Sequence, residues 1–176
     1  MKKTIIINPI ASLITILGGE AKWQEALSSP VNCKKALAAM ELDPCAKNVI
    51  SCLRMIQNRF KTVVVTDYDS AVVRIVTRHF GIPAIAVFGG RQSKASQYNR
   101  ALRKAGSSAE DAVVVSALRS DLFEAEVLGI TGLYYGANRC YPNSVRCKED
   151  LCRQLGIRLE KTESILRNES KKRLTR

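Results

Sequence analysis

Short runs of β-branched and other apolar residues recur along this chain, and a segment with helical periodicity separates each run from the next. Such runs are typical of buried strands, because they are short, nearly free of polar residues and end at turn-forming residues. They cover residues 5–7, 63–65, 84–88, 112–115 and 132–135. Strands that alternate with helices at this spacing indicate βαβ units. We therefore expect an α/β fold, a doubly wound, Rossmann-like parallel sheet with helices on both faces.

The segments between the strands carry their own start and stop signals. Asp43-Pro44 supplies a capping residue and a first-turn proline ahead of one helix. Ser70 opens the next helix, which is expected to stop at Gly81. Further helices are expected over residues 95–105, 121–128 and 148–155. Ligands of such sheets bind at the carboxyl ends of the strands, so the residues directly after each strand are the candidates for chemistry.

The chain has 176 residues, a length that suits one domain with a sound core. We expect this domain over residues 1–136, followed by a basic, partly helical extension over residues 137–176. The net charge is +12, which favours a polyanionic partner such as RNA, an anionic membrane surface or an acidic protein in a larger assembly. The expected polyanion contacts near the end of the chain are Lys171, Lys172, Arg173 and Arg176.

The first residues superficially resemble a secretory signal, with two lysines followed by an apolar stretch. Asn8 and Pro9 interrupt that stretch, which is also too short to span a bilayer as a helix. We expect an intracellular protein, in the cytoplasm or an organelle matrix, with no signal peptide and no transmembrane segment. The six cysteines form no C-x-x-C pair, so free thiols are expected in place of a zinc or redox site.

One short motif raises the question of catalysis. Asp67-Tyr68-Asp69 directly follows the strand at residues 63–65, and a pair of aspartates at a strand end is typical of phosphate-handling enzymes. The alternative is structural: Asp69 is placed to cap the helix that begins at Ser70.

The chain resembles the haloacid dehalogenase (HAD) phosphatases. The residues that carry this resemblance are GIPAIAVFGGRQSKASQYNRALRKAG, EDAVVVSALRSDLFEAEVLGI and TGLYYG. They are similar to the second half of the family, most of all to its YqeG-type branch, which includes phosphatidylglycerophosphate phosphatases. The resemblance runs from Lys61 to Gly136 and extends more weakly back to Met1. It implies a HAD-like scaffold with little or no cap domain.

The first two catalytic motifs of the family fall on identifiable positions. The family's Asp-x-Asp-x-Thr loop, which holds the nucleophile and the acid-base residue, corresponds to Asn8, Ile10 and Ser12. The family's phosphate-binding Ser or Thr corresponds to Thr66. On this alignment Asp67 and Asp69 follow the second motif and are not the nucleophile pair.

The other two motifs are also altered. The resemblance puts Gln92 at the place of the family's lysine, with Lys94 two residues further on as a substitute. Ser116-Ala117 stands where the family has Gly-Asp, and only Asp121 remains of the acidic pair that holds magnesium.

These replacements remove the chemistry of the family. An amide at position 8 offers no anionic oxygen to attack phosphorus, and Ile10 transfers no proton. Magnesium needs carboxylate oxygens, so we expect no metal and no other cofactor. The resulting hypothesis is a catalytically inactive HAD-like pseudophosphatase that acts as a binding or structural subunit, in an RNA-protein or other polyanion-associated assembly.

Two alternatives stay open. An active phosphatase would hydrolyse a phosphate monoester, phosphatidylglycerophosphate-like, with magnesium and with Asp67 or Asp69 beside Asp121. A phosphate sensor would instead hold an anion with Thr66, Ser116, Ser120 and nearby backbone N–H groups, with Lys94 as a further phosphate contact, and leave it unreacted.

Overall fold

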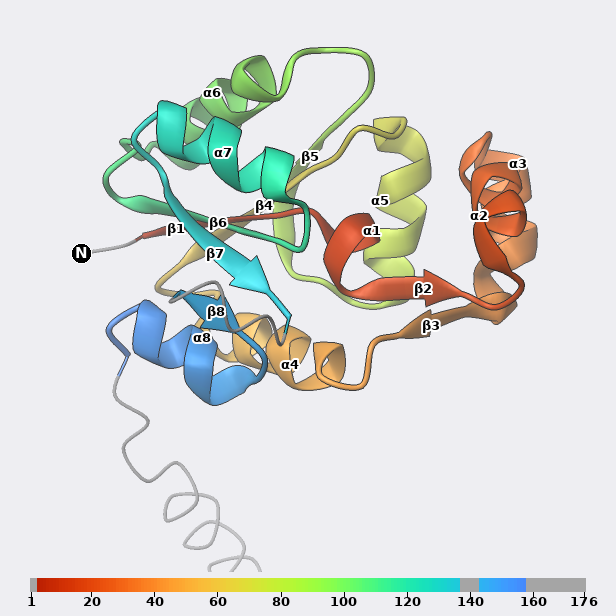
Figure 1. Ribbon diagram of the computed structural model, residues 1–176, viewed down its shortest axis with the longest axis horizontal. Helices are drawn as coiled ribbons and strands as arrows, with labels where there is room; N and C mark the ends of the chain where they lie inside the picture. The colour runs from red at the N-terminus through yellow and green to blue at the C-terminus, as the bar shows by residue number, and fades with distance from the viewer. Residues whose placement is uncertain (1–2, 137–142, 158–176) are drawn as a thin grey trace, which may run out of the picture.

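The computed structural model describes residues 3–136 and 143–157, and most of its strands form one sheet (Figure 1). Across this sheet the strands lie in the order β5 (Ala84–Phe88), β4 (Lys61–Val65), β1 (Thr4–Ile7), β6 (Ala112–Ser116), β7 (Thr131–Tyr135) and β8 (Ser144–Val145). Every neighbouring pair is parallel. The chain winds outward from β1 in both directions, so the strand order reverses at the carboxyl end of β1.

Helices cover both faces of the sheet. One face carries α4 (Ala46–Ile56), α5 (Ser70–His79) and α8 (Lys148–Gln154), and the other carries α6 (Lys94–Ala105) and α7 (Arg119–Val127). Successive strand side chains point to opposite faces, so Ile5 and Ile7 belong to one hydrophobic cluster and Ile6 to the other. Burial on both sides explains why the central strands are apolar throughout. The expected doubly wound α/β sheet is confirmed.

The local signals in the sequence agree with the helix boundaries. The Asp69 carboxylate accepts a hydrogen bond from the Ala71 N–H at 2.6 Å, which caps α5 as expected. The helix is followed by Gly81, whose φ of 63° is left-handed and therefore suits glycine. Asp43 Oδ1 accepts from the N–H of Cys45 at 3.0 Å, just before α4 begins.

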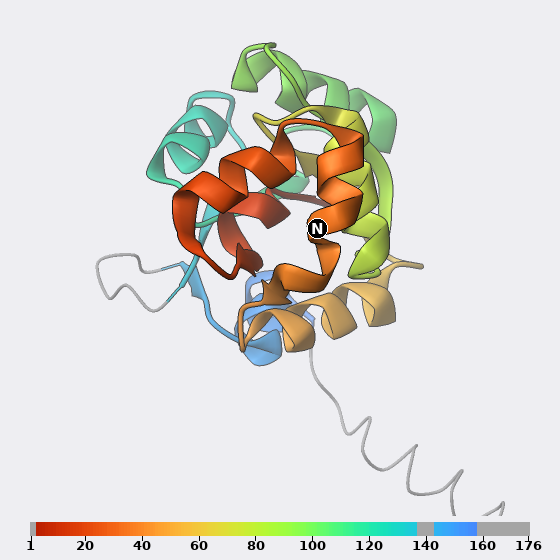
Figure 2. The same cartoon turned by 90° about the vertical axis from the view of Figure 1, so that its right-hand side faces the viewer.

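An excursion between β1 and α4 was not anticipated. It contains α1 (Pro9–Ser12), β2 (Ile14–Ile16), α2 (Gly19–Leu27), α3 (Pro30–Ala36), a 3₁₀ turn (Leu37–Ala39) and β3 (Met40–Leu42). Strands β2 and β3 pair antiparallel and form a narrow ribbon that leads to α2 and α3. Figure 2 looks onto these two helices, which lie in front of the main sheet.

The last described segment packs onto the domain. Val145 of β8 and Leu151 and Cys152 of α8 are buried in the same hydrophobic cluster as α4. Residues 143–157, which the sequence assigned to the extension, therefore contribute to the core. Lys171, Lys172, Arg173 and Arg176 lie outside the described residues.

Five cysteines lie in the described part of the chain, and all five are free thiols. Cys52 of α4 and Cys152 of α8 are buried with their sulfur atoms 3.3 Å apart. Burial, together with the neighbouring Cys152 thiol, raises the pKa of Cys52 to about 12, so this thiol stays protonated. Within residues 3–136 and 143–157, no helix combines the length and the apolar character needed to cross a membrane.

Candidate functional site

Polar residues from several loops meet at the carboxyl end of the sheet, beside the point where the strand order reverses. Asn8 directly follows β1, Thr66 follows β4, and Ser116 ends β6. Lys94 and Asp121 join them from the first turns of α6 and α7. We call the group formed by Asn8, Ser116, Asp121 and Lys94 the strand-end cluster.

Asp121 lies at the centre of the strand-end cluster, and its side chain is only 2% exposed. Its Oδ2 accepts hydrogen bonds from Asn8 Nδ2 at 3.0 Å and from Ser116 Oγ at 2.8 Å. Its Oδ1 lies 3.0 Å from Lys94 Nζ. The Tyr98 hydroxyl donates to the backbone oxygen of Asp121 at 3.0 Å, which fixes the start of α7. Donors therefore surround this carboxylate, as a buried charge requires.

The orientation of the Asn8 amide follows from this arrangement. An ionised carboxylate only accepts hydrogen bonds, so the NH₂ group of Asn8 must face Asp121 and its Oδ1 must point away. That Oδ1 is buried and has no hydrogen-bond partner among the described residues. Asn8, the residue that the resemblance places at the family's nucleophile, thus presents a donor to Asp121.

Lys94 lies between two carboxylates. Its Nζ is 2.9 Å from Asp67 Oδ1 as well as 3.0 Å from Asp121 Oδ1. The lysine side chain is 10% exposed and that of Asp67 is 61% exposed, so the pair with Asp121 is the buried one. Asp67 therefore takes part in the site, although as the outer partner of Lys94.

Of the two positions proposed for the family's lysine, Gln92 and its substitute Lys94, the structure brings the side chain of Lys94 to the strand ends. Gln92 does not reach the strand ends, since its Oε1 accepts a hydrogen bond from Arg100 at 2.6 Å on the surface. Lys94 reaches them instead. Ser93 caps α6 by accepting from the Ser96 N–H at 3.3 Å, so the next residue, Lys94, begins the helix beside the sheet. Gln92 precedes the cap and turns outward.

The remaining positions of the first two motifs have local structural roles. Ser12 Oγ accepts a hydrogen bond from the Ala117 N–H at 3.0 Å and so links the loops after β1 and β6. Thr66 is fully buried, and its Oγ1 accepts from the Tyr68 N–H at 3.3 Å. Ile10 is 5% exposed and belongs to the hydrophobic core. Of the residues expected to bind phosphate, Thr66, Lys94 and Ser116 have partners within the protein.

Tyr98 is a further residue of the site that the sequence analysis did not single out, and it is buried on the inner side of α6. Burial raises the pKa of Tyr98, and the negative charges of Asp121 and Asp67 raise it further. The hydroxyl therefore remains a neutral donor to the Asp121 backbone. A buried tyrosine needs a hydrogen-bond partner for its hydroxyl, and this rule could have predicted from the sequence that Tyr98 makes such a bond.

The architecture is a HAD-like α/β fold, and comparisons with solved structures agree. No family model matches the chain, and no curated protein matches it. Solved structures do. A hydrolase from Pseudomonas syringae is 13% identical with a TM-score of 0.67, covering 89% of this chain and 98% of that chain.

Two further structures carry the family's name. A haloacid dehalogenase-like hydrolase from Streptococcus pneumoniae is 13% identical, with a TM-score of 0.65 over 87% of this chain and 98% of that chain. A HAD-superfamily hydrolase from Ehrlichia chaffeensis is 15% identical, with a TM-score of 0.65 over 88% of this chain and 97% of that chain. These likenesses show the fold, and the resemblance to the YqeG-type branch stays a prediction.

The residues at the strand ends do not fit the magnesium ion that the fold family implies. Asn8, Ile10 and Ala117 contribute no carboxylate, and Asp121 Oδ2 already accepts two hydrogen bonds. Asn8 Oδ1 is a neutral oxygen on its own, whereas magnesium is bound through carboxylates in near-octahedral geometry. In the described part of the chain, no three His, Cys, Asp or Glu residues gather as a metal site.

Proposed function

We propose that this protein is a catalytically inactive member of the HAD-like fold class that serves as a binding or structural subunit. The observation that carries the proposal is the hydrogen bond from Asn8 Nδ2 to Asp121 Oδ2 at 3.0 Å. It puts an amide donor at the place where the family resemblance implies an attacking carboxylate.

At the positions that the family resemblance assigns, each step of phosphoryl transfer lacks its group. Attack on phosphorus needs an anionic oxygen, and the Asn8 amide has none. Proton transfer to the leaving group needs a titratable side chain, and Ile10 is an aliphatic residue of the core. The Lys94 charge is balanced by Asp121 and Asp67, which leaves a net negative site for an incoming phosphate to meet. The strand-end cluster therefore suits a structural role.

The charge of the whole chain supports a polyanionic or acidic partner. Twenty-eight lysine and arginine residues against 16 acidic residues give +12. A field of this size attracts RNA, anionic membrane surfaces and acidic proteins, and an RNA-protein assembly is the proposed setting. The proposal places this association at the surface and not at the strand ends.

The test is an activity assay with internal controls. The protein is incubated with magnesium and a panel of phosphate monoesters, including p-nitrophenyl phosphate and phosphatidylglycerophosphate. We expect no turnover above that of the Asp121→Asn variant, and no phospho-aspartate in mass spectra of the protein quenched during incubation with the substrates. Magnesium-dependent turnover by the unmodified protein would refute the proposal.

A second candidate rests on Asp67. This carboxylate follows β4, is 61% exposed and lies 2.9 Å from Lys94, so an incoming phosphate ester has access to it. The candidate is an active phosphatase with Asp67 as nucleophile. If turnover is found and both Asp67→Ala and Asp121→Ala abolish it, this candidate replaces the first.

A further inference from the structure

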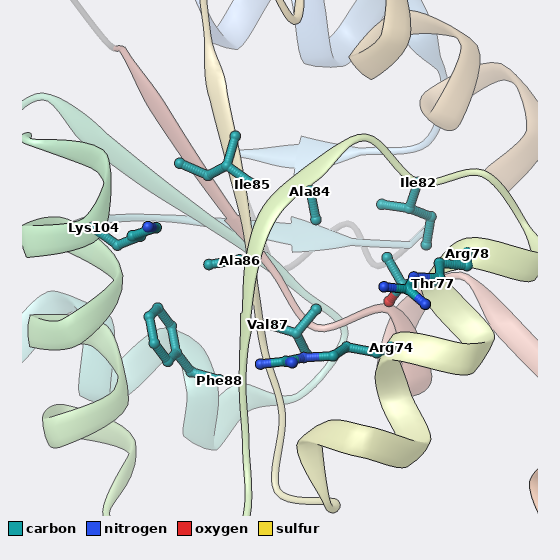
Figure 3. Close-up of a pocket in the computed structure, with 10 residues that line it drawn as sticks. All are labelled: Arg74, Thr77, Arg78, Ile82, Ala84, Ile85, Ala86, Val87, Phe88 and Lys104. Atoms are coloured by element: carbon teal, nitrogen blue, oxygen red, sulfur yellow. The ribbon is translucent and has the colours of Figure 1, made fainter. Parts of the chain in front are cut away.

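The sheet has an open edge at β5, and a groove runs along it. The groove has a volume of about 500 Å³ and is lined by β5 together with residues of α5 and α6. Figure 3 shows the strand between these two helices, with Arg74 and Lys104 extending toward it from opposite sides. We call this feature the β5 groove.

The backbone of β5 has hydrogen-bonding groups to offer on this side. The Phe88 C=O accepts from the Thr66 N–H at 3.0 Å, so Phe88 faces β4. Because the N–H and C=O groups of neighbouring strand residues point in opposite directions, those of Val87 face the open edge. Such an edge is a template for pairing with another strand.

A bulge shapes the same edge. Thr62 pairs with Ala84 and Val63 pairs with Ala86, so Ile85 is the extra residue on β5. Ile85 is 48% exposed, which is high for an isoleucine in a sheet. The bulge limits the regular edge to a few residues, so a partner strand needs side-chain contacts in addition to backbone pairing.

The cations around the groove have no counter-charge. Arg74 and Arg78 line it from α5 and Lys104 lines it from α6, whereas no acidic side chain lines it. Among the described residues, none of these three side chains forms an ion pair. Arg100 adds a fourth positive charge nearby, with its guanidinium 4.7 Å from the ring centre of Phe88. The groove thus combines an apolar floor with positive charge on both rims.

We propose that the β5 groove binds an extended, acidic segment of a partner protein, which adds to the sheet as a further strand beside β5. The outward backbone groups of Val87 and the exposed Ile85 match a peptide strand with apolar side chains. The cations on α5 and α6 match carboxylates on its two faces, since successive side chains of a strand point to opposite sides.

A nucleic acid fits these features less well. Phosphates suit the cations, but a nucleic-acid backbone neither completes a β-ladder nor covers an isoleucine. The stacking position on Phe88, which a base would need, is already taken by Arg100. The inference goes beyond the proposed function and does not depend on the strand-end cluster, so one can fail while the other holds.

The binding experiment uses the full chain and a fluorescent peptide that repeats Glu-Glu-Val-Val, an order that puts glutamates on both faces of a strand. Anisotropy measures affinity for three forms of the protein. The groove variant is Arg74→Glu/Arg78→Glu/Lys104→Glu. The matched control is Lys34→Glu/Lys47→Glu/Arg59→Glu, which changes net charge equally at exposed residues outside the groove.

We expect the groove variant to bind at least about tenfold more weakly than the unmodified protein, and the control variant to bind within about threefold of it. Equal losses in the two variants would mean that only net charge matters, and that result would overturn the inference. So would the absence of peptide binding to the unmodified protein.

A second peptide separates strand pairing from simple charge attraction. It carries proline in place of each valine, which keeps the charge and removes ladder donors. We expect at least about tenfold weaker binding of this peptide. We also expect the first peptide, but not the second, to slow hydrogen exchange of the Val87 amide. Equal affinity of the two peptides would contradict strand addition, and tighter groove-dependent binding of single-stranded RNA would reassign the groove to a nucleic acid.

Discussion

The strand-end cluster and the β5 groove both gather charged side chains, and they differ in what balances the charge. In the cluster, Asp121 is buried and pairs with Lys94, whose side chain is 10% exposed, and Asn8 and Ser116 donate further hydrogen bonds to the carboxylate. In the groove, Arg74, Arg78 and Lys104 line an open surface, and no acidic side chain of the described residues lines it with them.

The difference follows from the cost of removing a charge from water. A buried charge without a partner costs several kcal/mol, so the cluster must be satisfied within the chain. A surface charge keeps its hydration and tolerates the absence of a partner. Polar groups that are saturated internally stabilise a fold, whereas unpaired groups on a shaped surface remain available to another molecule.

The largest expected effect comes from Asp121→Ala. This change leaves Lys94 with only its exposed partner Asp67, and removes the acceptor of Asn8 and Ser116. We expect the free energy of unfolding to fall by about 3–5 kcal/mol, measured by urea denaturation. The control is Asp67→Ala, which removes the exposed partner of the same lysine and should cost less than about 1 kcal/mol. Similar losses in both variants would remove the distinction between buried and exposed pairs.

The second-largest loss of stability is expected from a substitution at Gly89. Gly89 follows β5, and a Cβ at this position would lie 2.3 Å from the Tyr68 carbonyl oxygen and 2.8 Å from Thr66 Cγ2. We expect Gly89→Ala to cost about 1–3 kcal/mol, because backbone must move to admit the methyl group. Gly132→Ala is the control, since its nearest contacts are at 3.4 Å, and thermal melting of both variants checks the prediction. A larger loss in the control would show that the loops after β4 and β5 are not tightly packed.

Asp150, near the start of α8, is a further carboxylate whose hydrogen bonds and charge pairs can be tested. Its burial acts to raise its pKa, but the Arg146 N–H, the Cys147 thiol and the charges of Arg153 and Arg146 outweigh it, and the pKa is lowered. A lowered carboxyl pKa contributes stability above the unfolded-state value of about 3.9, and this stability is lost as the pH falls through the folded-state pKa. We expect acid to lower the melting temperature less in Asp150→Asn than in the unmodified protein. Equal acid sensitivity would contradict the assignment.

The smallest expected effect belongs to the groove. Arg74 and Arg78 are four residues apart on α5, where like charges repel. We expect Arg78→Gln to change the free energy of unfolding by less than about 0.5 kcal/mol, with a slight gain at low salt that high salt removes. A clear loss of stability would mean that Arg78 has an internal role and is not free for a partner.

Much of the fold was predictable because its signals are local. The apolar runs at residues 63–65 and 84–88, and the cap provided by Asp69, depend on neighbours in sequence, and each appears in the structure where expected. Parallel strands with buried faces leave few arrangements, so the doubly wound sheet follows from their number and spacing.

The excursion after β1 was not predictable to the same extent. Residues 14–16 form a strand that is only three residues long, and its partner lies at residues 40–42. Such short pairs carry little periodicity. Ser29-Pro30 is the same kind of helix-start signal as Asp43-Pro44, and it would have revealed α3.

The candidate site was located but not resolved from the sequence. Asn8 and Ser116 were identified as positions at strand ends and Asp121 as the remaining acid at the start of a helix, and the structure brings the three together. The resemblance put Gln92 at the place of the family's lysine and offered Lys94 only as a substitute, because spacing in a loop does not fix which side chain turns inward. The cap at Ser93 decides this for Lys94, and it depends on backbone geometry.

The burial of Ile10 makes it costly to restore an acid at this position. Its side chain fills part of the hydrophobic core at 5% exposure, so an aspartate restored at this position would be placed among hydrocarbon neighbours. Such a reversion would cost several kcal/mol, a large share of the stability of an ordinary domain. Under the proposal, restoring an acid at position 10 therefore requires the surrounding core to change as well, so no single substitution returns this residue to catalysis.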